Sequence, residues 1–138
     1  MLSFSRTTKQ NWYNKGLIDT SPDMRNQLLN AGVGSLDGVV YTHSHADHVH
    51  GLDDLRMIFF NMRTRINVWA DQSTQNDLIE RFKYAFVQPE ASPYPPILNL
   101  NTIKGITSIE GNGGPLTCLL YTSPSPRDLS TSRMPSSA

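Results

Sequence analysis

The stretch Gly38-Val39-Val40-Tyr41-Thr42-His43-Ser44-His45-Ala46-Asp47-His48 decides the fold of this chain. Its first five residues are short, apolar and rich in β-branched side chains, which predicts a buried strand. The histidines and the aspartate follow at once and therefore occupy a loop at the end of that strand. In such a loop His43 and His45, two positions apart, can point the same way toward one metal. Asp47 and His48 can then face a second metal alongside.

All 4 histidines of the 138-residue chain lie between His43 and His50. Imidazole nitrogen has the softness and the pKa that suit a divalent transition metal at neutral pH. Two neighbouring metals would polarise a phosphoryl or carbonyl oxygen and lower the pKa of a bound water to near neutrality. The pattern therefore predicts a two-metal site and hydrolytic chemistry, and the alternative is a solvated polar loop.

The sequence on either side alternates predicted strands and helices. The helix after the histidines carries Leu52, Leu55, Ile58 and Phe59 on one face. This order predicts an α/β fold. The predicted elements are a strand at 16–19, a helix from Ser21 to the glycine at 32, the strand at 38–42, a helix at 51–62, a strand at 65–70, a helix capped by Ser73 or Thr74, a proline-rich connection at 89–96, and two strands at 103–110 and 116–121.

The histidine loop resembles the H-x-H-x-D-H signature of the metallo-β-lactamase-fold hydrolases, matched here by His43, His45, Asp47 and His48. The flanking segments look most like the branch that contains the phosphoribosyl cyclic phosphate phosphodiesterases (PhnP-like). The resemblance runs from about residue 17 to about residue 119. It implies the N-terminal half of an αββα sandwich.

The resemblance also implies a site. His43 and His45 would bind the first of two zinc or manganese ions, and Asp47 and His48 the second. Asp47 would also take a proton from the nucleophilic water, and a metal-bound hydroxide would attack a cyclic or other small phosphodiester. The family uses three later ligands, two of them histidines, whereas this chain has no histidine after His50. We therefore expect a fragment that hydrolyses little or nothing by itself.

Four further residues are weaker candidates for the site. Asp19, at the end of its strand, could orient a ligand histidine through the free ring nitrogen, or it could simply begin a helix. Arg56, one turn after the metal loop, could hold a substrate phosphate. His50 could contact the substrate or lie on the surface. Asp53 stands at a helix start, where its charge is stabilised without any catalytic role.

The two ends of the chain differ from the middle. Residues 1–15 are polar and predict an irregular segment that is neither a secretory signal nor a membrane span. Residues 122–138 are rich in serine and proline, which predicts disorder. They also resemble translated adapter sequence from environmental sequencing. We therefore expect a partial domain over 16–121 followed by a non-native tail.

The formal net charge is zero, which gives no indication of a surface for nucleic acid. The single cysteine excludes an internal disulfide and is compatible with the cytoplasm. We expect a small-molecule partner and no membrane, and the sequence gives no oligomeric state. Three alternatives stay open. The first is another hydrolase of the same fold that acts on a thioester, a lactone or RNA 3′ ends. The second is a metal-binding fragment without activity, and the third is a poorly folded chain.

Overall fold

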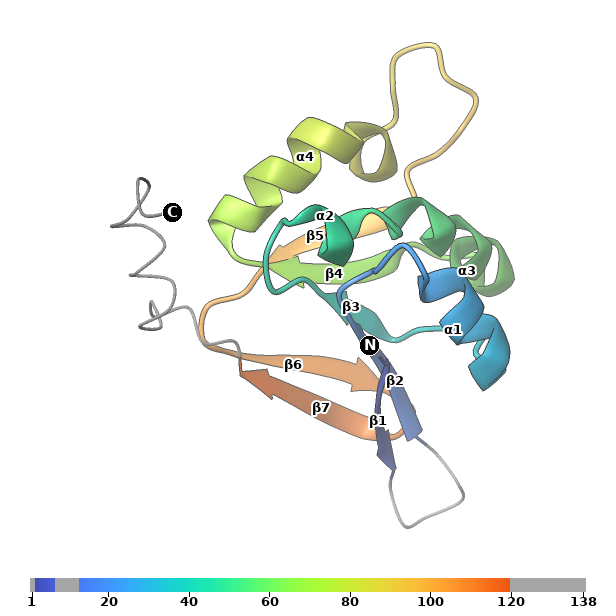
Figure 1. Cartoon of the computed structure of the whole chain (residues 1–138), viewed down its shortest axis with the longest axis vertical. Helices are drawn as coiled ribbons and strands as arrows, with labels where there is room; N and C mark the ends of the chain where they lie inside the picture. The colour runs from blue at the N-terminus through green and yellow to red at the C-terminus, as the bar shows by residue number, and fades with distance from the viewer. Residues whose placement is uncertain (1, 7–12, 120–138) are drawn as a thin grey trace.

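The structure is a computed structural model that describes residues 2–6 and 13–119. A five-stranded sheet organises it, in the order β1-β2-β3-β4-β5 (Figure 1). Strand β1 is antiparallel to β2, and the other neighbours are parallel. Parallel strands end at the same edge of a sheet, so the segments that follow β2 and β3 lie side by side. The strands are β1 (Leu2–Arg6), β2 (Tyr13–Ile18), β3 (Gly38–Val40), β4 (Ile66–Ala70) and β5 (Leu98–Thr102).

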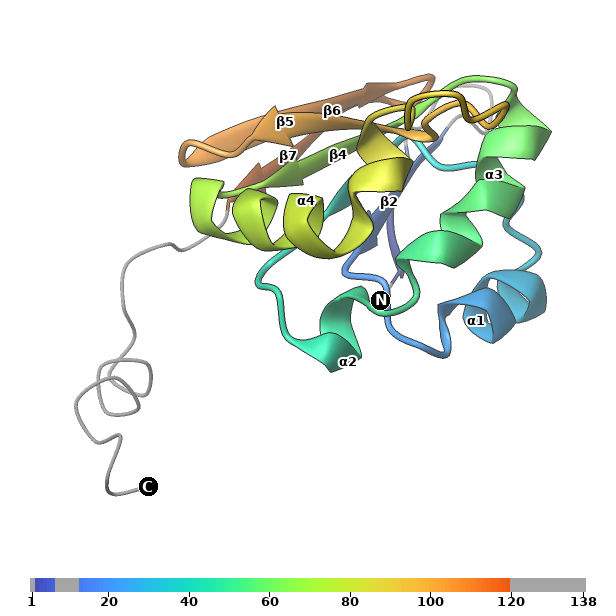
Figure 2. The same ribbon diagram turned by 90° about the horizontal axis from the view of Figure 1, so that it is seen from above.

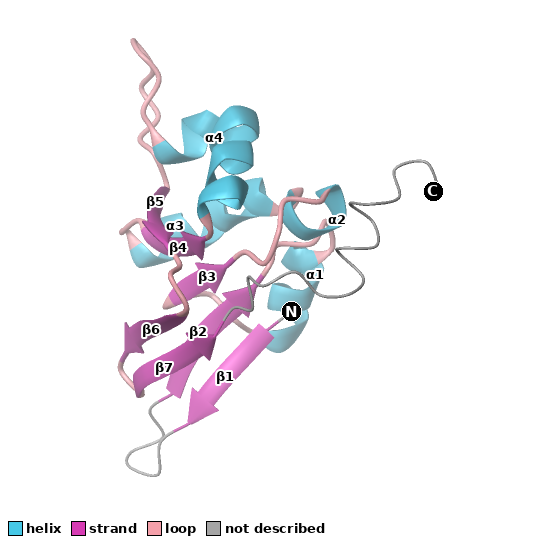
Figure 3. Ribbon diagram, turned by 90° about the vertical axis from the view of Figure 1, so that its left-hand side faces the viewer, coloured by secondary structure: helices cyan, strands magenta, loops and turns pink. Residues whose placement is uncertain are grey.

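Helices cover one face of this sheet, and a β-hairpin lies against the other (Figure 2). The hairpin consists of β6 (Ile106–Gly111) and β7 (Gly114–Leu119), and both of its strands contact β2 (Figure 3). The molecule therefore has three layers: helices, the five-stranded sheet and the two-stranded sheet. The helical elements are α1 (Met24–Ala31), α2 (Ala46–Val49), the 3-10 turn η1 (Leu52–Asp54), α3 (Leu55–Met62) and α4 (Gln72–Phe86).

Strand β3 is apolar at every position because both of its faces are covered. Successive side chains of a strand point to opposite faces. Val39 and Tyr41 belong to the main core between the sheet and the helices. Val40 belongs to a second core with Ile109 of the hairpin, against which Trp69 packs. The run of apolar residues before the histidines is thus a strand buried between two layers.

Several sequence predictions need correction. Residues 2–6 form β1, although an irregular N-terminal segment was expected. Strand β5 at 98–102 was not predicted, and β6 begins at Ile106 instead of Ile103. The helix expected over 51–62 is divided into η1 and α3, because the Asp54 amide donates to the Gly51 carbonyl three residues back. The tail expected after residue 121 lies outside the described residues.

The predicted helix caps also differ from the structure. Helix α1 has Asp23 as its N-cap instead of Ser21, and α4 has Asp71 instead of Ser73 or Thr74. The Asp71 carboxylate accepts the Thr74 amide at 2.8 Å, which satisfies one of the free N–H groups of the first turn. Among the described helices, none is both long and apolar enough to cross a membrane.

Candidate metal centre

The histidine loop lies at the carboxyl edge of the sheet, next to the end of β2. The Asp19 amide donates to the Val40 carbonyl at 2.8 Å, so the two strand ends are tied together. On the other side, the Tyr41 amide donates to the Trp69 carbonyl at 2.9 Å, which ties β3 to β4. Three neighbouring strand ends therefore fix the backbone just before His43.

The Asp19 carboxylate is the centre of the hydrogen bonds at this edge. Its Oδ1 accepts the Thr42 amide, and its Oδ2 accepts both the Thr42 hydroxyl and Nδ1 of His48, each at 2.8 Å. Asp19 has a left-handed backbone with φ 58°, which an aspartate tolerates better than most residues. It is 9% exposed. A buried carboxylate with three donors has its hydrogen-bonding capacity well satisfied.

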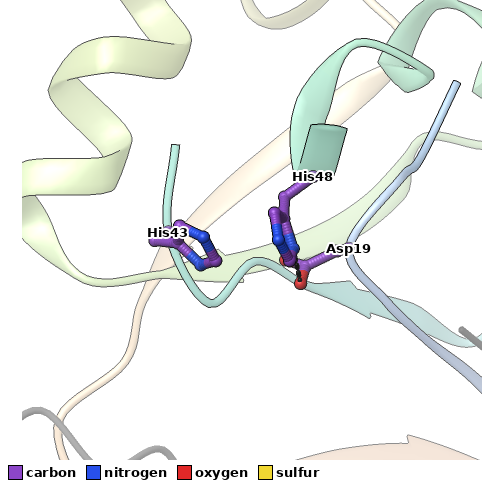
Figure 4. Close-up of side chains that lie close together, drawn as sticks. All are labelled: Asp19, His43 and His48. Atoms are coloured by element: carbon purple, nitrogen blue, oxygen red, sulfur yellow. Dashed lines mark hydrogen bonds and ion pairs between the residues drawn. The ribbon is translucent and has the colours of Figure 1, made fainter. Parts of the chain in front are cut away.

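These contacts determine which nitrogen of two histidines carries the proton. A carboxylate only accepts, so His48 must donate from Nδ1. The Thr42 hydroxyl gives its single proton to Asp19, so it can only accept from Nδ1 of His43, 2.8 Å away. When either ring is neutral, its lone pair is therefore on Nε2. Figure 4 shows the rings of His43 and His48 close together, with Asp19 beside His48.

The remaining residues of the motif lie around the same two rings. The His45 ring stands edge-on to the His43 ring, with centroids 4.6 Å apart, and the His43 and His48 centroids are 3.9 Å apart. The exposed Asp47 carboxylate lies 3.5 Å from Nε2 of His48. Nitrogen and carboxylate donors gathered in this way fit a divalent transition metal. One compact group within it, formed by Asp19, His43 and His48, has ligand atoms within 4.8 Å of one another.

The local charges favour the form of His43 that binds a metal. Burial lowers the pKa of His43, and the neighbouring His48 and His45 lower it further, against the opposing effect of Asp19 and Asp47. A lowered pKa keeps the imidazole neutral over a wider pH range, and only the neutral ring offers a lone pair.

A cavity of about 220 Å³ opens beside His48. Asp19, Ser21 and Asp47 contribute to its walls. The Ser21 hydroxyl is buried and finds no hydrogen-bond partner among the described residues. A small polar molecule in this cavity could therefore approach the carboxylates of Asp19 and Asp47 and the His48 ring.

Helix α4 contacts the histidine loop at Ser44, between His43 and His45. This contact was not predicted from the sequence. The Ser44 hydroxyl donates to Asp77 at 2.5 Å, and the Arg81 guanidinium donates to the Ser44 carbonyl at 2.5 Å. Asp77 and Arg81 are four residues apart, a spacing that places them on one face of a helix. That spacing was the available signal, but nothing in the sequence indicates Ser44 as their partner.

Three of the weaker candidates lie apart from the histidine cluster. The exposed His50 ring faces Phe82 at a centroid distance of 6.4 Å. Asp53 accepts the Tyr84 hydroxyl at 2.5 Å, and Arg56 lines a separate pocket. The structure therefore groups Asp19 with the four motif residues and connects these other three to α4 and its neighbourhood.

A family model described as a β-lactamase superfamily domain matches residues 14–136. The chain belongs to the metallo-β-lactamase superfamily. This membership confirms the family resemblance and the α/β fold class predicted from the sequence. Within the superfamily domain, the described part supplies helices on one face of a mostly parallel sheet and the hairpin on the other.

The relatives of this chain include an octanoyltransferase and a diphosphatase. It is 46% identical over 90 residues to the octanoyltransferase of Porphyromonas gingivalis (strain ATCC BAA-308 / W83), covering 64% of this chain and 17% of that protein. It also matches the crystal structure of a new diphosphatase from the PhnP family, with a TM-score of 0.59 and 33% identity, covering 71% of this chain and 37% of that chain. The chain thus spans well under half the length of either relative.

Proposed function

We propose that this chain carries the metal-binding part of a hydrolase whose substrate is a cyclic or other small phosphodiester. One observation carries the proposal. Nδ1 of His43 and of His48 is engaged as a donor, by Thr42 and by Asp19, which leaves both Nε2 lone pairs available to a metal. A ring with its other nitrogen hydrogen-bonded in this way is the usual arrangement of a metal-binding histidine.

In this proposal each residue has a defined role. His43, His45, Asp47 and His48 hold one or two ions, zinc or manganese. A bound metal supplies Lewis acidity and lowers the pKa of water. Asp19 holds His48 directly and His43 through Thr42. Asp47, with an exposed carboxylate, can accept a proton from an attacking water.

The substrate class rests on the relative of known structure. That protein is described as a diphosphatase from the PhnP family. The octanoyltransferase match covers 17% of that protein, so it gives little reason to assign acyl transfer to the shared segment. A cytoplasmic location, the absence of a nucleic-acid partner and a domain end near residue 121 stay predictions.

Metal binding is tested by calorimetric titration of the EDTA-treated, dialysed chain with Zn²⁺ and with Mn²⁺. We expect saturable binding, and we expect His43→Ala and His48→Ala each to weaken it by at least about tenfold. His50→Ala is the matched control, because that histidine lies beside Phe82 outside the cluster. Equal affinity for all of these chains would overturn the metal-site proposal.

The substrate class is tested by incubating the metal-loaded chain separately with bis(p-nitrophenyl) phosphate, with a thioester and with a lactone. Hydrolysis is expected to be slight, because this chain has no histidine after His50 to complete the family's ligand set, and to exceed the background of metal alone for the phosphodiester only. Preferred turnover of the thioester or the lactone would assign another hydrolase of the same fold. Metal binding without turnover of any substrate would make this chain a metal-binding module and contradict the phosphodiesterase proposal for it.

A further inference from the structure

A second cavity lies away from the histidine cluster, between α3, the end of α4 and the loop that follows it. Its volume is about 480 Å³, within the size range of small-molecule sites, on the order of 300–1,000 Å³. Arg56 and Phe60 of α3, Tyr84 of α4 and Tyr94 of the loop contribute to its walls. It shares no lining residue with the cavity beside His48.

Aromatic rings contribute to the walls of this cavity, together with two prolines. Phe60 is 58% exposed and Tyr94 is 69% exposed, which is unusual for such large apolar side chains. The Tyr84 ring is held in place because its hydroxyl donates to Asp53 at 2.5 Å. Exposed aromatic residues at a concave site can stack against a planar ligand.

A single positive charge stands among these rings. The half-buried Arg56 guanidinium makes no hydrogen bond or ion pair within the part of the chain that the structure describes. Asp53, the acidic residue one helical turn before it, accepts a hydrogen bond from Tyr84 instead. A guanidinium has a planar set of donors that matches a phosphate or carboxylate group. The cavity therefore offers aromatic surfaces together with a guanidinium that has no ion-pair partner among the described residues.

We propose that this pocket binds a planar aromatic ring that carries an anionic group, the chemistry of a nucleoside monophosphate. The ring stacks on the aromatic walls and the phosphate pairs with Arg56. Both features are needed, because rings alone would accept any apolar ligand and an isolated arginine would accept any anion. The site is separate from the metal centre and does not depend on a bound metal.

The test is a binding titration of the full 138-residue chain in EDTA, so that no metal takes part. The probes are adenosine 5′-monophosphate, adenosine and inorganic phosphate. We expect the monophosphate to bind at least about tenfold more tightly than either of the other probes, as one charge-assisted contact added to stacking would give. Arg56→Gln is expected to weaken the monophosphate about tenfold and to leave adenosine unchanged.

Two further variants complete the design. Tyr94→Ala removes a stacking surface from a loop and is expected to weaken the monophosphate and adenosine alike. Arg25→Gln removes the same charge from an exposed position on α1 and is expected to change nothing. Circular dichroism of each variant verifies the fold. The proposal is overturned if the monophosphate does not bind at about 1 mM, if it binds no better than phosphate, or if Arg56→Gln behaves like Arg25→Gln. None of these outcomes bears on the metal site.

Discussion

Asp19 shows how much of the site follows from single residues. Its place beside the histidine loop could be predicted, because it ends a strand next to the strand that His43 follows. The closeness of His43, His45, Asp47 and His48 could be predicted from their spacing. The hydrogen-bond partners of Asp19 could not be predicted, since its contact with His48 depends on the left-handed backbone at Asp19, with φ 58°. Nothing in the sequence specifies that angle.

Replacing Asp19 with asparagine should weaken metal binding by about 10–100-fold. Asparagine tolerates the left-handed backbone, so the change removes the charge without adding strain. Its amide nitrogen cannot accept the Nδ1 proton of His48, and the ring loses its orientation. Zinc titration by calorimetry measures the effect. Asp23→Asn, the same charge change at the exposed start of α1, is the control, and equal affinities for the two variants would contradict the role of Asp19.

Acid should destabilise the metal-free chain through His43. Its pKa is lowered in the folded state by burial and by His48 and His45, while the unfolded value stays near 6.5. Below about pH 6.5 the unfolded chain therefore binds more protons, and the free energy of unfolding decreases until the folded pKa is passed. Urea denaturation at a series of pH values should show a shallower acid slope for His43→Gln. Identical slopes would argue against a lowered pKa.

At the level of elements, the buried parts were the most predictable. Strands β2, β3 and β4 and helix α4 lie within a few residues of their predicted positions, because their apolar runs fill the two cores. Strand β5 was missed although its leucines at 98 and 100 alternate with asparagines. No element was predicted between the proline-rich connection and residue 103, but Leu98 lies in the main core and the whole strand pairs with β4. Residues 2–6 are a strand for the same reason, by pairing with β2.

Helix α4 should strengthen metal binding by holding the loop at Ser44. The helix is a firm support, since its buried Gln75 donates to the Ala70 carbonyl at 2.9 Å and to Thr102 at 2.8 Å. Asp77→Asn is expected to reduce zinc affinity about tenfold, because the proposed ligands His43 and His45 flank Ser44, the residue that Asp77 holds. Cobalt substitution should also show a changed absorption spectrum, which reports on ligand geometry independently of stability.

Glu80→Gln is the control for this experiment. It removes the same charge from an exposed position of the same helix, and Glu80 has no hydrogen bond to the loop. A long-range charge effect would lower zinc affinity similarly in both variants. That result would contradict a specific contact between Asp77 and Ser44.

At the scale of the whole molecule, one side chain joins the hairpin to the main sheet. Asn14 of β2 is fully buried, and its Oδ1 accepts the Gly113 amide at 2.8 Å, while its Nδ2 donates to the Gly114 carbonyl. These contacts bridge about a hundred positions of sequence. A Cβ at Gly111 would lie 2.4 Å from the Asn14 oxygen, so only glycine allows this approach. The amide therefore fixes where the turn of the hairpin sits on the sheet.

Asn14→Ala should lower the free energy of unfolding by about 1–3 kcal/mol, because it leaves a buried amide and a carbonyl of the turn without their partners. Urea denaturation measures the loss, and hydrogen exchange should show faster exchange at Gly113 than in β3. Asn112→Ala, at the exposed tip of the same turn, should stay near the wild-type value. If the two variants were equally stable, the hairpin would be held by the apolar contacts of Ile109 and its neighbours alone. The expected difference instead makes the docking of the second sheet depend on one polar side chain in β2, the strand that ends beside Asp19.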